Sequence, residues 1–270
     1  MVKQKFTFLF LHGAWHNKIV WHKVQHQLEQ MGHKTHAITL PGMGDKGYPV
    51  EGITNEQLSN IAPITLTTQV QFVVEYLKSI EGKVFCVAWS QAGMILSQLM
   101  EVIPEKIQMG IYLSAFMPQD GKSLFDYAKP DEESVVSQKI SFLPVGSYPG
   151  NQEIPPVACF VPDAHLVEAF YENCSQEDIS LLKRTLVVQP LGTFAEPVNL
   201  GKSYESVRKA YISCTEDRAI TSIAQHEMYT AHFNENFAPH DVYRIETDHT
   251  APFSTPKTLS KVLHRIARKG

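Results

Sequence analysis

The chain has 270 residues, of which 43% are hydrophobic and 19% charged, and its formal net charge is −4. These values are those of an ordinary globular protein, so they exclude a disordered chain, a collagen-like chain and a coiled coil. A net negative charge also argues against a nucleic-acid-binding protein, and the apolar stretches are far shorter than the ~20 residues that span a bilayer.

The first strong feature is an apolar run at residues 5–11, which predicts a strand buried on both faces. No small-residue cleavage site follows this run, so we interpret it as a strand and not as a signal peptide. The cysteines form no C-x-x-C pair, which favours reduced thiols in a cytoplasmic protein. They are Cys86, Cys159, Cys174 and Cys214.

Apolar runs alternate along the chain with segments whose apolar residues recur every three or four positions. The predicted strands cover residues 5–11, 35–40, 84–87, 107–113, 210–213 and 242–245. The predicted helices cover residues 21–31, 66–80, 92–102, 221–232 and 256–268, and a loop rich in Gly, Pro, Asp and Asn is expected at 41–63. This order predicts an α/β fold with a mainly parallel sheet of about six strands, flanked by helices and joined by right-handed crossovers.

One segment interrupts the alternation. From Pro118 to about Tyr204, prolines accumulate and acidic residues outnumber basic ones. We therefore expect a core formed by residues 1–117 and 205–270, with residues 118–204 inserted as a cap. Such a cap would cover the carboxyl ends of the strands, where α/β proteins place their sites.

The sharpest local motif is the segment 87–93 (VAWSQAG), in which a predicted strand runs directly into a helix through Ser90. A nucleophile elbow needs small residues two positions before and after its serine, and the usual pattern is G-x-S-x-G. Here Ala88 and Ala92 hold those positions and Gly93 follows. The alternative is an ordinary strand-to-helix turn in which Ser90 caps the helix.

A second turn of small residues follows the first strand, in the segment 11–15 (LHGAW). Such a turn can direct a backbone N–H group at a developing oxyanion. We expect the N–H groups of Ala14 and Gln91 to form that pair, because Gln91 follows the predicted nucleophile. The alternative is a β–α turn in which Gly13 only relieves backbone strain.

The order of the polar residues supports a serine hydrolase, in which Ser, acid and His follow one another along the chain. Asp217 follows the predicted strand 210–213, and His249 follows the strand 242–245. His249 would accept the Ser90 proton, and Asp217 would orient the imidazole. Glu216 and Asp248 are rival acids.

The sequence predicts neither a metal site nor a cofactor site. His12 and His16 are four residues apart, but a Gly-Ala turn separates them and no H-E-x-x-H motif occurs. Gly42 and Gly44 lack the third glycine of a dinucleotide-binding fingerprint.

Together with other segments, these motifs make the chain resemble the α/β-hydrolases that include plant methyl esterases, hydroxynitrile lyases and bacterial esterase relatives. The resemblance covers nearly the whole chain. The segments that carry it are 11–16 (LHGAWH), 32–33 (GH), 64–66 (ITL), 112–118 (YLSAFMP), 170–178 (FYENCSQED), 189–191 (QPL), 211–217 (YISCTED) and 248–256 (DHTAPFSTP).

The resemblance implies Ser90 as nucleophile, Asp217 as acid and His249 as base, with Ala14 and Gln91 as oxyanion donors. It also implies that no cofactor or metal is needed, and that two copies form a homodimer. The elbow departs from the related pattern G-H-S-x-G-G, since Ala88 and Ala92 replace glycines and Trp89 replaces the histidine. We expect Trp89 to alter packing more than chemistry.

The function predicted from these features is a serine carboxylic-ester hydrolase that acts on a small, partly apolar ester through an acyl-enzyme. The residues expected to line its pocket are His12, Trp15, Phe116, Met117, Phe125, Phe160, Phe170 and Tyr171. One alternative is an enzyme that cleaves C–C or C–N bonds on the same triad, as hydroxynitrile lyases do. Those lyases carry a lysine directly after the catalytic histidine, whereas this chain has Thr250. Another alternative is a ligand-binding receptor that has lost turnover.

Overall fold

The computed structural model describes residues 5–128, 131–144 and 155–270. In these ranges the main element is a six-stranded parallel sheet with the strand order β2-β1-β3-β4-β8-β9. The strands are β1 (Thr7–Leu11), β2 (Lys34–Ile38), β3 (Val84–Trp89), β4 (Ile107–Leu113), β8 (Lys209–Cys214) and β9 (Val242–Ile245). The predicted α/β fold with about six strands is therefore confirmed.

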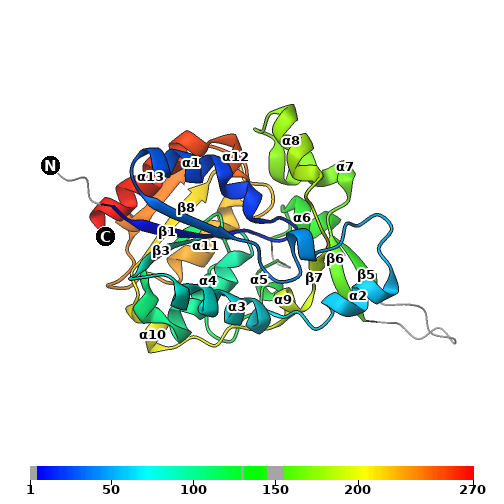
Figure 1. Ribbon diagram of the computed structural model, residues 1–270, viewed down its shortest axis with the longest axis horizontal. Helices are drawn as coiled ribbons and strands as arrows, with labels where there is room; N and C mark the ends of the chain where they lie inside the picture. Colours follow the sequence, from blue (N-terminus) through cyan, green and yellow to red (C-terminus); the bar gives the residue numbers. More distant parts are fainter. Residues whose placement is uncertain (1–4, 129–130, 145–154) are drawn as a thin grey trace.

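Helices cover both faces of this sheet (Figure 1). They are α1 (His22–Gln30), α3 (Leu66–Ser79), α4 (Ala92–Val102), α10 (Lys202–Ser206), α11 (Ser222–Thr230), α12 (Ala251–Ser254) and α13 (Pro256–Lys269). On one face α1 packs against α12 and α13, and on the other α3 and α10 pack against α4. Every residue of β3 is buried, which explains why the central strands are continuous apolar runs.

The strand order places β1 between β2 and β3, so the chain forms β2 on one side of β1 and then returns to form β3 on the other side of β1. At such a reversal the loops after the two central strands diverge and open a crevice at their carboxyl ends. The loop after β1 and the turn after β3 are direct neighbours here. A Cβ built on Gly13 would lie only 2.7 Å from the Cβ of Ser90.

The loop predicted at residues 41–63 is partly wrong, because it contains the helix α2 (Asn55–Ile61). The Thr54 hydroxyl accepts the N–H of Gln57, and the Gln57 side chain accepts the N–H of Thr54, which forms a capping box. This T-x-x-Q signal is present in the sequence but lies within a stretch dense in Gly and Pro. Helix α2 packs against the strand β6 (Pro156–Phe160).

Residues 118–204 form mainly short elements, most of which lie away from the C-terminus, while the last residues of the segment run back to α10 (Figure 1). In the described part of this segment, β6 pairs antiparallel with β5 (Ser141–Pro144) and β7 (Gln189–Pro190). The helices are α5 (Phe125–Ala128), α6 (Val135–Lys139), α7 (Asp163–Leu166), α8 (Gln176–Lys183), α9 (Gly192–Ala195) and a π-helical turn (Val167–Tyr171). Residues 129–130 and 145–154 of the predicted cap lie outside the described residues.

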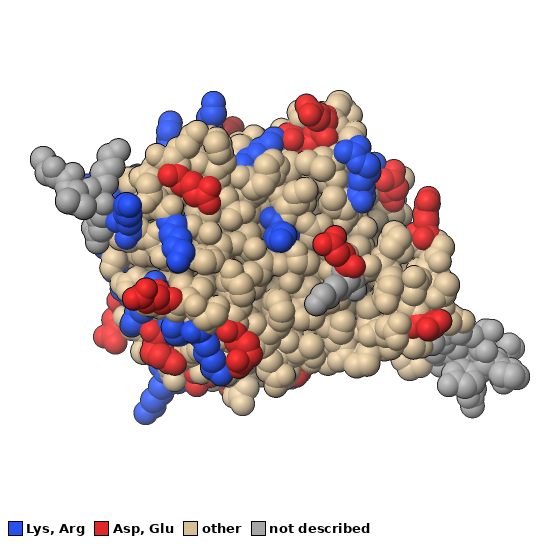
Figure 2. Space-filling view, viewed as in Figure 1, with Lys and Arg blue, Asp and Glu red and all other residues tan. Residues whose placement is uncertain are grey.

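Basic and acidic side chains are interspersed over the face of the molecule shown in Figure 2, with broad uncharged areas between them. None of the helices in the described ranges is both long enough and apolar enough to cross a bilayer. All four cysteines are free, and Cys86, Cys159 and Cys214 are buried.

Candidate active site

Ser90 lies in a tight turn between β3 and α4. Its φ is +59°, a left-handed conformation that is uncommon for residues other than glycine and that often occurs where function depends on backbone strain. The Ser90 carbonyl accepts the N–H groups of Gly93 and Phe116, both at 3.1 Å. These bonds tie the turn to the segment after β4 and hold the serine in its strained conformation.

His249 and Asp217 form a buried hydrogen-bonded pair. Nδ1 of His249 lies 2.7 Å from Oδ2 of Asp217, and the two side chains are 1% and 0% exposed. Because a carboxylate oxygen accepts, Nδ1 carries the proton in this pair. Nε2 of His249 then keeps its lone pair, as a general base requires.

The carboxylate of Asp217 accepts four further hydrogen bonds. Oδ1 accepts the N–H groups of Ala219 and Ile220, at 2.7 and 2.9 Å. Oδ2 also accepts the Ser114 hydroxyl and the Gln225 amide, the latter at 3.2 Å. Neither side chain was predicted to act at the site. Ser114 belongs to the segment YLSAFMP that carries the family resemblance, whereas Gln225 sits in α11 with no motif around it.

The rival acids have other partners. Glu216 accepts the Asn173 amide at 2.7 Å. Asp248 accepts the N–H of Asn173 at 2.8 Å and the hydroxyl of Ser254 at 2.7 Å, and burial raises its pKa. Glu216 thus connects the loop after β8, and Asp248 the loop around His249, to the segment that precedes α8.

The N–H groups of Ala14 and Gln91 have no acceptor within residues 5–128, 131–144 and 155–270. Both residues are buried, and buried N–H groups without a partner are rare in folded proteins. The next residue, Trp15, has a φ of +62°, and its N–H donates to Oε1 of Gln189 at 3.0 Å. The two free N–H groups are thus available to an oxygen atom of a ligand.

His12 and His16 hold the loop after β1 and stay neutral. Nδ1 of His12 donates to the Gly13 carbonyl and its Nε2 accepts the Leu40 N–H, and His12 is not among the described residues that line the cavity in front of Ser90. Nδ1 of His16 donates to the Ala14 carbonyl and Nε2 accepts the Tyr171 hydroxyl, both at 2.7 Å. Burial lowers the pKa of His12 to about 4 and that of His16 to about 3.

A cavity of about 360 Å³ opens in front of Ser90, and Ala14 and Gln91 also line it. Four of the predicted pocket residues line it as well: Trp15, Phe116, Phe125 and Phe170. The ring centroid of Phe170 lies 5.6 Å from that of His249, so this side chain connects the cavity to the buried His–Asp pair.

The other predicted pocket residues lie outside the lining of this cavity. Tyr171 is fully buried and turns its hydroxyl to His16, while its neighbour Phe170 faces the cavity. Met117 is buried and lines the second cavity, which is described below. Phe160 pairs with Ser141 in the antiparallel sheet.

Sequence reasoning missed the rest of the lining, which comes from residues 118–204 and the loop after β8. These residues are Leu124, Ala128, Val136, Ser137, Ile140, Phe142, Phe194, Ala219 and Ile220. In the described part of the chain, the lining contains no charged side chain. Among these residues, Phe194 lies nearest to a sequence motif, because it follows the segment 189–191 (QPL) by three residues.

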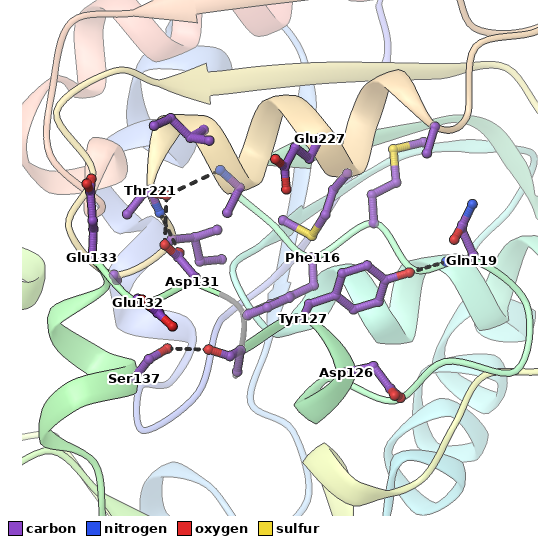
Figure 3. A pocket seen from close by; sticks show the side chains of 18 residues that line it. Phe116, Gln119, Asp126, Tyr127, Asp131, Glu132, Glu133, Ser137, Thr221 and Glu227 are labelled. Carbon is purple, nitrogen blue, oxygen red and sulfur yellow. Dashed lines mark hydrogen bonds between the residues drawn. The ribbon is translucent and has the colours of Figure 1, made fainter.

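A second cavity, of about 430 Å³, adjoins the first (Figure 3). Figure 3 shows Asp131 accepting from the N–H and hydroxyl of Thr221, at 2.9 and 2.8 Å. Ser90 is not among the described residues that line it. The two cavities share the residues Phe116, Ala128, Ser137, Ala219 and Ile220.

No group of three or more His, Cys, Asp or Glu side chains suited to a metal ion occurs in the described ranges.

The parallel sheet, the strained serine turn and the buried His–Asp pair at the strand ends define an α/β-hydrolase. Residues 8–262 match the Alpha/beta hydrolase family, and the chain belongs to that family. The family resemblance inferred from the sequence is thereby confirmed.

Individual relatives match the chain over nearly its full length. Salicylic acid-binding protein 2 of Nicotiana tabacum is 30% identical over 279 residues, which cover 99% of both chains. Norfluorocurarine synthase 1 of Strychnos nux-vomica is 29% identical over 282 residues, which cover 99% of this chain and 97% of that protein. The crystal structure of polyneuridine aldehyde esterase superimposes with a TM-score of 0.80 at 26% identity, covering 98% of this chain and 100% of that one.

Proposed function

We propose that the protein is a serine carboxylic-ester hydrolase for a small, partly apolar ester. The observation that carries this proposal is the convergence of three groups on one largely apolar cavity. These groups are the strained Ser90 and the free N–H groups of Ala14 and Gln91. The buried Asp217–His249 pair supplies the base that a serine needs to act as a nucleophile at neutral pH.

In the proposed reaction, Nε2 of His249 accepts the Ser90 proton while Oγ attacks the ester carbonyl carbon. The N–H groups of Ala14 and Gln91 donate to the oxyanion of the tetrahedral intermediate, each contributing about 3 kcal/mol to the barrier reduction. The alcohol leaves with the proton from His249, and a water molecule, deprotonated by His249, then hydrolyses the acyl-enzyme. Asp217 stabilises the imidazolium that forms in each half-reaction.

We further propose that residues 118–204 act as a cap that selects the substrate. Phe125, Phe170 and Phe194 from this segment line the cavity. Two contacts support a fixed position over the core: the Tyr171 hydroxyl bonds to His16, and Lys23 forms a 2.6 Å ion pair with Asp178. An apolar lining whose described residues carry no charged side chain favours an uncharged, partly apolar ester.

The similarity to polyneuridine aldehyde esterase supports ester hydrolysis, and Thr250 in place of a lysine disfavours cyanide release. The second candidate is a receptor for a small carboxylic acid, which the name of salicylic acid-binding protein 2 favours. In either case we propose a cytoplasmic location, consistent with four free thiols, and a homodimer.

The test is the intact mass of the protein after treatment with a fluorophosphonate probe. We expect one adduct on the wild type and none on Ser90→Ala, while Ser260→Ala, which changes a buried serine of α13, labels like the wild type. A panel of p-nitrophenyl and methyl esters then identifies the substrate. An unchanged esterase rate in Ser90→Ala would refute the proposed nucleophile, and a wild type that forms no adduct would favour the receptor.

A further inference from the structure

Trp89 contacts the loop that carries His249. This tryptophan ends β3, directly before Ser90, and is fully buried. Its indole N–H donates to the carbonyl oxygen of His249 at 2.8 Å. Its ring centroid lies 5.0 Å from that of His249 and 4.8 Å from that of His16.

The bond from Trp89 complements the one from Asp217. Asp217 holds the imidazole of His249 through Nδ1, whereas Trp89 holds the backbone of the same residue. A side chain fixed at its ring and at its backbone has little freedom to rotate or shift. Because Trp89 and Ser90 are adjacent in the chain, the end of β3 then determines the position of both the nucleophile and the base.

We propose that Trp89 is a positioning residue that sets His249 relative to Ser90, in addition to filling space under the elbow. This inference rests on the proposed function, in which His249 is the base. It assigns a role in catalysis to a residue at which the sequence departs from the related G-H-S-x-G-G pattern. The indole supplies two contacts at once, an N–H donor for the His249 carbonyl and a ring that packs against its imidazole at an angle of 39°.

The variant Trp89→Phe tests the proposal, because it keeps an aromatic ring and removes the N–H donor. The matched control is Trp21→Phe. Trp21 is also fully buried, it packs against Phe10 with ring centroids 4.7 Å apart, and its indole N–H has no partner in the described ranges. Both variants replace a buried tryptophan with phenylalanine, but only Trp89→Phe removes a hydrogen bond to His249.

For Trp89→Phe we expect kcat to fall about 10-fold while KM stays within about twofold, because small errors in the placement of a catalytic group affect the reaction more than binding. The rate constant of fluorophosphonate labelling should fall by a similar factor. Both quantities should stay within about twofold of wild type in Trp21→Phe. A second readout is the downfield proton NMR signal of the His249 Nδ1–H, which should shift or broaden in Trp89→Phe only.

Three outcomes would overturn the proposal. In the first, Trp89→Phe keeps kcat, the labelling rate and the downfield signal of the wild type. In the second, Trp21→Phe loses as much activity as Trp89→Phe, so that the effect comes from loosening of the core. In the third, the wild type itself forms no adduct, which refutes the proposed function together with this inference. In the first two outcomes the wild type is labelled and the proposed function stands.

Discussion

Replacing Gly13 with alanine tests whether the loop after β1 is part of the catalytic machinery. A Cβ at this position would lie 2.7 Å from the Cβ of Ser90, 3.3 Å from its Oγ and 3.2 Å from Cε3 of Trp89. Carbon atoms in folded proteins normally approach to ~3.5–4 Å, so the loop and the serine turn must separate by about 1 Å. The residue that follows, Ala14, carries one of the proposed oxyanion donors.

The size of the expected effect follows from this displacement. A shift of ~1 Å in a catalytic group costs about 100-fold in rate, which corresponds to about 2.7 kcal/mol of transition-state stabilisation. Overpacking at Gly13 should also lower the free energy of unfolding by about 1–3 kcal/mol. The assay is therefore kcat and KM on an ester substrate, measured beside urea unfolding of the same variant.

Gly110→Ala is the matched control. Gly110 lies in β4, and a Cβ there would approach Sδ of Met100 to 2.6 Å, an overlap of similar size in the core of the sheet. Because the flexible end of Met100 can shift, whereas the Cβ of Ser90 moves only with its backbone, we expect Gly110→Ala to lose less stability than Gly13→Ala and to keep kcat within about twofold of wild type. If Gly13→Ala loses about 1–3 kcal/mol of stability but keeps kcat within about threefold, then the loop after β1 does not position an oxyanion donor.

Two further predictions concern stability. Gln225→Leu leaves the N–H and carbonyl groups of Cys214 without the partners that Gln225 supplies, and it removes one donor from Asp217. Urea unfolding should therefore show that the free energy of unfolding falls by about 2–4 kcal/mol. A decrease below about 0.5 kcal/mol would contradict this prediction. Burial lowers the pKa of His12 to about 4 and of His16 to about 3, from 6.5, so the unfolded chain binds more protons below pH 6.5. The stability from these neutral rings is complete above pH 6.5 and falls with acidification, by up to about 2.7 kcal/mol per pH unit near pH 5, where both unfolded side chains are protonated. His16→Gln should reduce the pH dependence that these two rings cause by about half. Equal free energies of unfolding at pH 7 and pH 5 in the wild type would refute the prediction.

The positions of the candidate catalytic residues could be predicted because they depend on topology. Parallel strands bring their carboxyl ends to one edge of the sheet, so loops far apart in sequence meet there. Ser90 follows β3, Asp217 follows β8 and His249 follows β9. The rule states which loops meet but not which atoms bond, and the contacts of Ser114 and Gln225 with Asp217 depend on side-chain directions that the sequence pattern does not contain.

The cavity lining was harder to predict because the segment 118–204 lacks long periodic elements. The strands in the described part of this segment have two to five residues and contain prolines, so apolar runs do not identify them. The type of a residue also says little about the direction in which its side chain points. Phe170 and Tyr171 are adjacent aromatic residues in the same π-helical turn, yet Phe170 faces the cavity and Tyr171 bonds to His16.

The elbow shows which parts of the G-H-S-x-G-G pattern follow from close backbone contacts. Ala88 and Ala92 replace glycines of that pattern, and their methyl groups are accommodated in the buried core. Gly93 is retained, and a Cβ there would lie 1.9 Å from the carbonyl oxygen of Phe116. That carbonyl belongs to the segment after β4 whose N–H bonds to Ser90, so it cannot move away without breaking the bond that holds the serine turn. The strict steric requirement of this elbow therefore lies at position 93, and a substitution at Gly93 should disturb Ser90 more than the alanines at 88 and 92 do.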